Sequence, residues 1–362
     1  MRFVRLQQID GNEILARPIL DLAGRVLLSK GVQLKLGYLN KLDTLGVSGV
    51  YIEDKISEGI EVEDVISEET RLKSQLVIQK EMDRFLKNKQ IDTLVIRKVV
   101  NNIIQDILSK KHLLLNLSDI RTKDNYTFAH SVNVCVLSIL LSIKLGFNFE
   151  RIKSIATGCL LHDFGKMLLP NEILNKPGQL TAEEYAEIKK HPLYGYQALK
   201  DDVTLDAIAK VTILMHHERV DGLGYPHGIS GEKIHEAAKI CGVCDSFDAL
   251  TSDRIYRKAW SICDAVEYMY SMSGTQYDKR IVDEFLRFVA IYPEGTVVLL
   301  NTNIIAIVVK NNHHNILRPI VRFLYNIKTR IKYIHYEVDM MKDLTLKIEK
   351  PVELNLKKIQ DV

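Results

Sequence analysis

The chain has 362 residues, enough for more than one domain, and its 46% hydrophobic and 26% charged content is ordinary for a globular protein. Lysine and arginine total 49 against 46 aspartates and glutamates, which gives a formal charge of +3. This balance argues against a protein that binds a nucleic-acid polymer or a membrane through its bulk charge. A small phosphate-bearing ligand needs only local positive charge, so the composition leaves such a ligand open.

Nothing in the sequence indicates secretion or membrane insertion. The N-terminal stretch MRFVRLQQIDGNEI lacks the apolar core of a secretory signal. The apolar run from Val132 to Leu145 is shorter than a membrane span and is interrupted by polar residues, so we expect a buried core helix. An odd number of cysteines in apolar stretches favours reduced core residues in a cytoplasmic protein. These are Cys135, Cys159, Cys241, Cys244 and Cys263.

The first third of the chain changes character near residue 59. Residues 1–58 predict a small β-containing module, because short β-branched runs alternate with turn signals, and a helix is expected around Leu34 to Leu45. Residues 59–116 carry apolar positions at helical spacing, which predicts a helical linker of two long amphipathic helices. The helices of 61–116 either cover the next domain or pair with a second subunit as a homodimer, and the sequence does not choose.

The remaining two thirds divide near residue 290. Residues 117–289 predict a strongly helical domain punctuated by glycine and proline. From 290 to 362 strand-like runs such as IIAIVV return and predict a small β appendage. The expected fold is therefore multidomain and mainly α, with an all-α central domain between two small β-containing modules.

A glycine-rich loop in the helical domain separates two groups of polar residues. His216 and His217 end an apolar run, where bare imidazoles are unfavourable unless they are ligated or hydrogen-bonded. The following DGLGYPHG cannot be helical, so we expect Tyr225 on an extended loop beside the histidines. Downstream, Asp245 and Asp248 lie three residues apart on one helical face. The pattern is typical of half a metal site with a ligand clamp above it.

Further residues of the kinds that bind metals lie upstream, namely His130, His162, Asp163 and His191. A single histidine is most often a solvated or core residue, since one imidazole does not require a metal. Here, however, pairs of potential metal ligands follow an apolar run twice in one domain. Two such pairs are harder to explain as ordinary solvated or core residues. Lys166 shares a helical face with the pair at 162–163, and a cation there suits an anionic substrate.

These motifs resemble those of the HD superfamily of metal-dependent phosphohydrolases. The resemblance rests on the HD pair at 162–163 with Lys166, on His130 upstream and on His191 downstream. The stretch HHERVDGLGYPHG is similar to the signature of the HD-GYP subgroup, the cyclic-di-GMP phosphodiesterases. The resemblance covers about Asp124 to Lys258, with HD, HP, HHE, DG-x-GYP and D-x-FDALTSDR-x-YR in order.

The resemblance implies an HD-type helical domain with two divalent metal ions. One ion would be held by His130, His162 and Asp245, the other by His191, His216 and His217, with Asp163 bridging the two. Mixed imidazole and carboxylate ligands suit iron or manganese, and zinc is also compatible with them.

The resemblance also implies contacts with the substrate. Lys166 and Asp163 would act at the scissile phosphate, with Asp124 as a further polar group of the catalytic site that can also cap a helix. The residues implied to hold guanine and phosphate groups are Gly224, Tyr225, Pro226, Asp248, Arg254 and Arg257. The two arginines also have a plainer interpretation as surface charges.

The implied function is hydrolysis of cyclic-di-GMP to linear pGpG, with little or slow formation of GMP. This product is expected because Tyr126 occupies the position where some family members carry a glutamate that helps to hold a third metal. Two alternatives are a catalytically silent cyclic-di-GMP receptor and an HD hydrolase of another nucleotide. The complete set of seven ligand residues and the intact GYP loop favour the enzyme.

Overall fold

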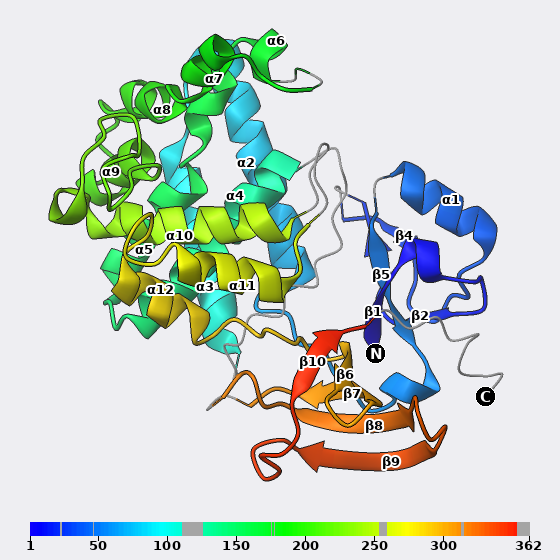
Figure 1. The fold of residues 1–362 in the computed structure, drawn as a ribbon. Coiled ribbons are helices and arrows are strands. Elements are labelled where there is room, and N and C mark those ends of the chain that lie inside the picture. The colour runs from blue at the N-terminus through cyan, green and yellow to red at the C-terminus, as the bar shows by residue number, and fades with distance from the viewer. Residues whose placement is uncertain are drawn as a thin grey trace. The chain divides into compact units, whose positions relative to one another are not determined.

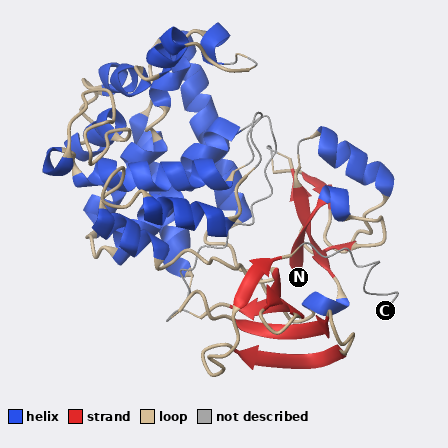
Figure 2. Cartoon of the chain, viewed as in Figure 1, coloured by secondary structure: helices blue, strands red, loops and turns tan. Residues whose placement is uncertain are grey.

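The computed structural model describes residues 1–352 apart from 22–23, 46, 111–125, 175, 177, 253–258 and 313–314. In its described parts the chain forms two compact units: a β unit of residues 1–64 and 288–352, and a helical unit of residues 65–110 and 126–287. Figures 1 and 2 show strands gathered in the first unit and nearly all helices in the second. The predicted fold class, mainly α with β modules at both ends, is confirmed.

The N-terminal part of the β unit is an antiparallel sheet in the order β1-β5-β2, formed by Arg2–Arg5, Gly49–Glu53 and Ile14–Leu15. A two-stranded hairpin accompanies it, with β3 at Ile19–Leu20 and β4 at Val26–Leu28, and short 3₁₀ turns lie at Leu6–Gln8 and Lys55–Ser57. The helix α1 (Leu36–Thr44) buries Leu39 and Leu42 against this sheet, which confirms the helix predicted there.

The C-terminal part of the β unit is a five-stranded antiparallel sheet in the order β10-β6-β7-β8-β9. Its strands are β6 (Val297–Leu300), β7 (Ile304–Lys310), β8 (Ile320–Asn326), β9 (Lys332–Asp339) and β10 (Ile348–Pro351). The central strand β7 is almost wholly buried, and its run of Ile and Val fits a strand that is covered on both faces.

The two ends of the chain share one hydrophobic core within the β unit. Tyr51, Ile60 and Val62 from the N-terminal part pack in the same cluster as Ile305 and Ile307 of β7. The guanidinium of Arg322 on β8 adds a polar tie, because it donates hydrogen bonds to the carbonyl oxygens of residues 56 and 58 at 3.3 and 2.7 Å. Parts of the chain that the sequence suggests as separate modules are therefore one folded body.

The helical unit contains α2 (Glu68–Asn88), α3 (Thr93–Ser109), α4 (Tyr126–Lys144), α5 (Phe149–Leu160), α6 (Asn171–Leu174), α7 (Ala182–Ile188), α8 (His191–Leu199), α9 (Ala207–Met215), α10 (Glu236–Thr251), α11 (Ile262–Ser271) and α12 (Lys279–Leu286). Two 3₁₀ turns, η4 (Phe164–Leu168) and η5 (Gly231–Lys233), connect them. Helix α4 contacts α2, α3, α5, α10 and α12, so it is the centre of this unit.

Helices α2 and α3 cover the other helices of this unit with their apolar faces. On α3 the buried residues recur at helical spacing, from Ile96 through Ile103 to Ile107. On α2 the ring of Phe85 packs edge-on against Phe164 of η4, with the ring centroids 4.7 Å apart. Of the two roles that the sequence left open, covering the next domain is the one seen within a single chain.

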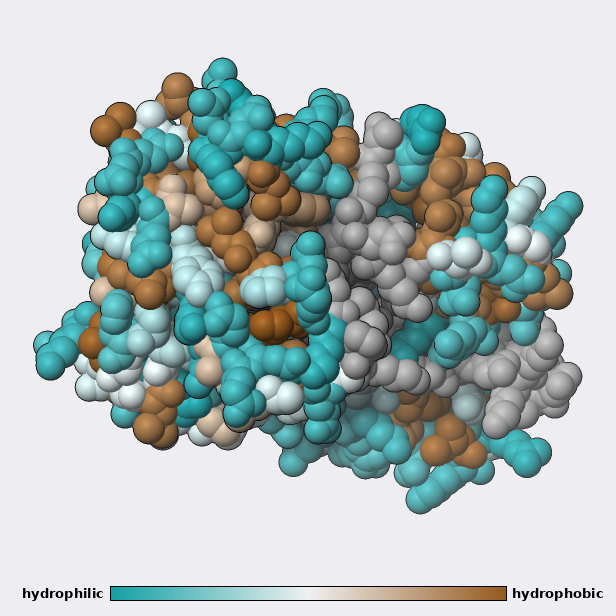
Figure 3. Space-filling view, turned by 90° about the horizontal axis from the view of Figure 1, so that it is seen from above, coloured by the Kyte–Doolittle hydropathy of each residue, from teal (hydrophilic) through white to brown (hydrophobic). Residues whose placement is uncertain are grey.

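The apolar helix α4 is a core helix, as the sequence predicts. Within the described residues Thr127–Lys144 is long and apolar enough to cross a membrane, but 78% of that window is buried inside the protein. On the face drawn in Figure 3, hydrophobic residues lie in small groups among hydrophilic ones. The length and composition of α4 are thus explained by its central position.

A close backbone contact sets the distance between η4 and α8. A Cβ atom on Gly165 would overlap the carbonyl oxygen of His191 and would lie 2.5 Å from the amide nitrogen of Gly195. Backbone atoms cannot yield as the end of a flexible side chain does, so only glycine fits here. The contact brings the first residue of α8, His191, beside the turn that carries Asp163.

We predict that Gly165→Ala destabilises the protein by about 3 kcal/mol, because overpacking of this size forces backbone shifts. The matched control is Gly37→Ala in α1, where an added Cβ meets nothing within 4 Å. This control should be neutral or slightly stabilising, since alanine is the better helix former. Thermal unfolding followed by circular dichroism measures both changes, and equal stability of Gly165→Ala and wild type would contradict the argument.

Candidate functional site

Seven polar residues converge where several helices of the helical unit begin or end. The structure brings them together in two groups, within each of which the candidate ligand atoms lie within 4.8 Å of one another. The first group is His130, His162 and Asp245, and the second is Asp163, His191, His216 and His217. Six of the seven are buried and His217 is half-buried, so the groups form a polar cluster inside an apolar unit.

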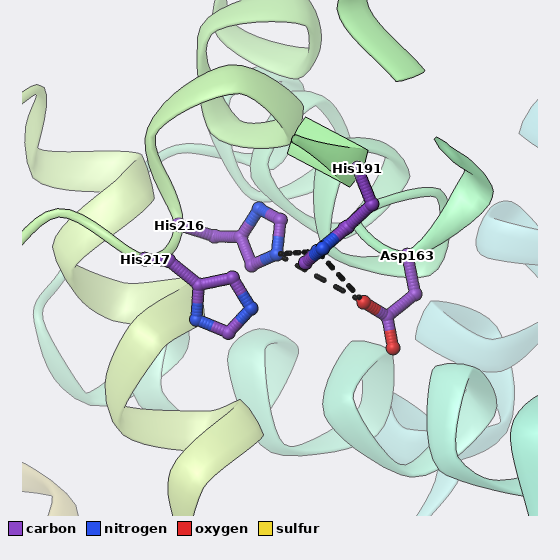
Figure 4. A group of neighbouring side chains, drawn as sticks. All are labelled: Asp163, His191, His216 and His217. Atoms are coloured by element: carbon purple, nitrogen blue, oxygen red, sulfur yellow. Dashed lines mark hydrogen bonds and ion pairs between the residues drawn. The ribbon is translucent and has the colours of Figure 1, made fainter. Parts of the chain in front are cut away.

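The carboxylate of Asp163 lies between the two groups. Its Oδ2 is 3.3 Å from Nε2 of His162 in the first group, and its Oδ1 is 3.3 Å from Nε2 of His191 in the second. In Figure 4 His191 and His216 face this carboxylate, and His217 lies beside His216. An aspartate with one oxygen turned toward each group is placed as a bridging ligand would be.

Backbone carbonyls fix the tautomer of three of the histidines. Nδ1 of His162 donates to the carbonyl oxygen of residue 159 at 2.7 Å, Nδ1 of His191 to that of residue 188 at 2.8 Å, and Nδ1 of His216 to that of residue 213 at 2.9 Å. A carbonyl oxygen only accepts, so each Nδ1 carries a proton, and in the neutral form of these imidazoles the lone pair is on Nε2. In each case Nε2 is the atom that approaches Asp163, and a free lone pair there is what a metal ion needs.

Two atoms at the middle of the cluster lack a hydrogen-bond partner among the described residues. They are Nε2 of His162 and Oδ1 of Asp163, both fully shielded from solvent. A buried polar atom without a partner is destabilising by about 1–3 kcal/mol, so such atoms in a folded protein need an explanation. A cation bound between the imidazoles and the carboxylates would satisfy both atoms, and the donor set fits a transition metal.

Most of the cluster has the protonation state that metal binding requires. Burial lowers the pKa of His217 to about 3 and that of His216 well below 6.5, so both imidazoles are neutral near pH 7. Burial acts to raise the pKa of both carboxyls, but nearby positive charge, including the Lys166 ammonium, holds the pKa of Asp163 well below 3.8, and the hydrogen bond from His130 does the same for Asp245. Ionised carboxylates and neutral imidazoles are the forms that bind metal ions.

His130 differs from the other histidines of the cluster. Burial acts to lower its pKa, but hydrogen bonds with Asp245 and Asp248 outweigh burial and raise the pKa from 6.5 to about 9. Its Nδ1 lies 2.7 Å from Oδ2 of Asp248, and its Nε2 lies 3.0 Å from Oδ1 of Asp245. Without a cation in the first group, this imidazole therefore holds a second proton at neutral pH.

The second group opens onto a pocket of about 550 Å³. Its walls include His191, His217 and Asp245 from the cluster. Lys166 also lines it, and its ammonium group donates a hydrogen bond to Oδ2 of Asp163 at 2.6 Å. The lysine thus places a positive charge between the carboxylate of Asp163 and the space where a ligand would bind.

The loop after His217 is folded back onto that histidine. The amide of Tyr225 donates to the carbonyl oxygen of His217 at 3.1 Å, and the two rings lie 4.6 Å apart. Glu218 holds the far side of the loop by accepting from the amides of residues 227 and 229 at 2.8 and 3.1 Å. A Cβ on Gly224 would lie 2.5 Å from the carbonyl oxygen of His217, so this turn also requires glycine. Burial raises the pKa of Tyr225, which keeps its phenol protonated as a hydrogen-bond donor in the pocket.

Several residues expected at the substrate lie elsewhere or outside the described residues. Asp248 is fully buried on α10 beside His130 and is not among the residues that line the pocket. Pro226 follows Tyr225 in the loop and is likewise not a lining residue. Asp124, Arg254, Arg257 and the side chain of Tyr126 lie outside the described residues, so their roles stay predictions.

The sequence did not single out some residues that the fold brings to the site. Asn133 lies one helical turn after His130 and donates to Oδ1 of Asp248 at 3.0 Å, so its spacing was a usable signal. The pocket is also lined by Lys239, Gln276 and Tyr277, and no local sequence pattern indicates this role. Gln276 and Tyr277 are hydrogen-bonded to each other at 2.8 Å, which fixes two polar side chains on the pocket wall.

We predict that metal-free protein loses stability as the pH rises from 6.5 to 9. A group whose pKa is raised on folding contributes its full stability below its unfolded pKa and loses that contribution as the pH passes its folded value. For His130, from 6.5 to about 9, the loss is on the order of 3 kcal/mol. His216 and His217 are neutral in the folded state over this range and half-protonated at pH 6.5 in the unfolded state, so they offset the loss only near pH 6.5, by less than about 1 kcal/mol together.

His130→Gln is the matched control, because it removes the titrating group. Chemical unfolding of chelator-treated protein at several pH values should show the loss in wild type, with a much flatter profile in the variant. Parallel profiles would show that His130 does not hold the extra proton.

Two known domain families match parts of this chain. The HD domain family matches residues 103–281, and the KOW domain associated with the HD domain matches residues 297–359. Among solved structures, Bd1817, an HDG"Y"P protein from Bdellovibrio bacteriovorus, is similar with a TM-score of 0.51 and 19% identity. The similarity covers 78% of this chain and 97% of that one, and it shows a shared fold.

Curated relatives are named for activity on cyclic dinucleotides. The chain is 36% identical over 250 residues to the cyclic di-GMP phosphodiesterase PA4108 of Pseudomonas aeruginosa, covering 69% of this chain and 60% of that one. It is 38% identical over 169 residues to the cyclic di-GMP phosphodiesterase response regulator RpfG of Xanthomonas campestris, covering 46% and 45%. It is 34% identical over 190 residues to the 3'3'-cGAMP-specific phosphodiesterase 1 of Vibrio cholerae, covering 51% and 42%. The chain thus spans at most 60% of the length of these relatives, and through residues 103–281 it belongs to the HD domain family.

Proposed function

We propose that this chain is a cyclic-di-GMP phosphodiesterase that opens the ring by hydrolysing one phosphodiester bond and releases linear pGpG. The observation that carries the proposal is the carboxylate of Asp163 between two groups of imidazoles, beside a pocket with room for a dinucleotide. The names of the relatives, cyclic di-GMP phosphodiesterases in three of the first four cases, support the choice of substrate.

The proposed cofactor is a pair of divalent transition-metal ions, iron or manganese rather than an alkaline-earth ion, because imidazole predominates among the ligands. One ion would be held by His130, His162 and Asp245, and the other ion by His191, His216 and His217. Asp163 would contact both ions. Such a pair supplies a water activated at neutral pH and positive charge to offset the charge that develops on phosphate.

The residues of the chain itself account for substrate binding and orientation. Lys166 is in the pocket wall with its ammonium 2.6 Å from Asp163, so it can donate to a phosphate oxygen at the reacting centre without leaving the site. The phenol of Tyr225 is held over His217 by the loop and donates into the same pocket. Positively charged and neutral donors placed in advance around one point lower the free energy of a phosphate that gains charge there.

Two other functions fit the sequence less well. A catalytically silent receptor would need no complete ligand set, yet all seven ligand residues are present and lie together. Hydrolysis of another cyclic dinucleotide has a specific observation in its favour, since two of the relatives similar over about half of this chain are named 3'3'-cGAMP-specific phosphodiesterases. Parallel assays with cyclic-di-GMP and 3'3'-cGAMP therefore decide the substrate.

Pairing of two chains through α2 and α3 stays a proposal. Each helix buries one face within its own chain and keeps some apolar residues exposed, such as Leu86 on α2 and Leu94 and Leu108 on α3. Sedimentation analysis of the purified protein shows whether two chains associate, which tests this proposal.

We predict that protein purified without oxygen contains about two transition-metal ions per chain, and that Asp163→Asn lowers both metal content and turnover. An amide cannot bridge two cations as a carboxylate does. Loss of a group that only orients a metal ligand reduces affinity or activity by about 10–100-fold, so loss of the bridge should reduce turnover by at least about a hundredfold. Elemental analysis and chromatography of the reaction products measure the two effects.

Asp283→Asn is the matched control, because Asp283 is a partly exposed carboxylate on α12 paired with Lys279. It removes the same charge from the same helical unit and should leave metal content and turnover unchanged. Active wild-type protein with no bound metal would overturn the proposed mechanism.

We predict that pGpG accumulates and that GMP forms slowly or not at all. Tyr126 stands one helical turn before His130, where a carboxylate would help to bind a third cation. A phenol with a pKa near 10 is a poor ligand at pH 7, so the extra charge on the terminal phosphate of pGpG would lack a partner. Time-resolved chromatography should show pGpG rising as cyclic-di-GMP disappears, and Tyr126→Glu should speed the second cleavage. Immediate formation of GMP by wild type would contradict this expectation.

A further inference from the structure

A line of hydrogen bonds leads from helix α2 to the first ligand group. Nη1 of Arg71 on α2 donates to Oδ1 of Asn133 on α4 at 2.7 Å, and Nδ2 of Asn133 donates to Oδ1 of Asp248 on α10 at 3.0 Å. The other oxygen of Asp248 lies 2.7 Å from Nδ1 of His130. The line thus crosses three helices and ends on an imidazole of the first ligand group.

The chemistry of each group fixes the direction of this line. A guanidinium only donates, so the amide of Asn133 must present its oxygen to Arg71 and its nitrogen to Asp248. The carboxylate of Asp248 then accepts with one oxygen from the amide and with the other from the imidazole. This leaves Nε2 of His130 directed toward Asp245, at 3.0 Å.

The hydrogen bonds of this line are strengthened by their burial. The side chain of Arg71 is 12% exposed, Asn133 is 6% exposed, and Asp248 is fully buried. Water competes poorly for hydrogen bonds at such sites, and a charged donor at one end strengthens the bonds that follow. Groups that hold a metal-binding histidine by its other ring nitrogen fix the orientation of the ring and its basicity.

We propose that Arg71 is a positioning residue of the metal site, which acts through Asn133 and Asp248 to hold the imidazole of His130 in its ligating orientation. The inference rests on the two-metal site proposed above. Arg71 lies outside residues 103–281, which match the HD domain, so part of the support of the metal centre comes from a helix that the domain match does not include. Removing Arg71 should weaken the first metal and leave the second in place.

The test compares the release of manganese from full-length variants. Wild type, Arg71→Met, Arg71→Lys and Lys73→Met are loaded with Mn²⁺ and mixed with excess EDTA, and the release is followed in time. Lys73→Met is the matched control, since Lys73 is an exposed cation on the same helix with one ion pair to Glu69. We expect Arg71→Met to release one of its two ions about tenfold faster, the size of effect typical of groups that orient metal ligands.

The second ion should leave Arg71→Met at the wild-type rate. Arg71→Lys, which keeps a charged donor, should be close to wild type, and Lys73→Met should not differ from it. Arg71→Met leaves the buried Oδ1 of Asn133 without its donor, so its metal-free form should melt a few degrees below that of Lys73→Met. Unchanged release of the second ion is what separates positioning from a general loss of stability. If Arg71→Met does not yield folded protein, Arg71→Gln replaces it: its donor is neutral and shorter, so it should release the first ion faster than Arg71→Lys does.

Two results would overturn the inference. One is release from Arg71→Met at the rate of Lys73→Met. The other is faster release of both ions together with a lower melting temperature, which would mean that Arg71 only stabilises the fold. Wild type that binds no manganese at all would instead overturn the two-metal site itself.

Discussion

The carboxylate of Asp163, buried where two groups of imidazoles meet, is the constraint on which the helical unit depends. An ionised carboxylate in a protein interior is unfavourable by several kcal/mol unless charges and donors surround it closely. Here His162 and His191 approach at 3.3 Å and Lys166 at 2.6 Å. These groups come from separate segments, so the ends of α5, α8 and α9 and the face of α10 must meet at one point. The glycine at position 165 is what allows two of those segments to approach closely enough.

Much of this centre could be predicted from the sequence because each contribution is local. Paired polar residues that follow an apolar run, such as His162 with Asp163 and His216 with His217, indicate ligands at helix ends without any knowledge of the fold. The burial of α4 also followed from composition alone. What local patterns could not supply is contact between distant segments. Arg71 and Asn133 are 62 residues apart, and Asn133 and Asp248 are 115 apart.

The same reasoning applies to the pocket and to domain boundaries. Gln276 and Tyr277 line the pocket because the segment after α11 returns to the loop that follows His217, where the amide of Asp221 donates to the carbonyl oxygen of residue 275 at 2.9 Å. A change in composition near residue 117 marks a boundary in the sequence, yet α2 and α3 belong to the same compact unit as the seven candidate ligands. The composition of a segment indicates how much of it is exposed to solvent. Which compact unit the segment belongs to depends instead on the apolar faces against which it packs.

The shared core of the β unit has a consequence for synthesis on the ribosome. The helical unit is inserted, in sequence, between the two halves of the β unit, so its residues emerge before the second half exists. Val62 packs in the same cluster as Ile305, which is synthesised roughly 240 residues later. At about 5–20 residues per second that interval lasts roughly 10–50 s. During it the apolar surface of Tyr51, Ile60 and Val62 lacks its native cover, whereas the helical unit is complete once Arg287 has been made, before Ile305 appears. The inserted unit can therefore complete its fold before the unit that begins the chain, because only the latter needs residues beyond 287.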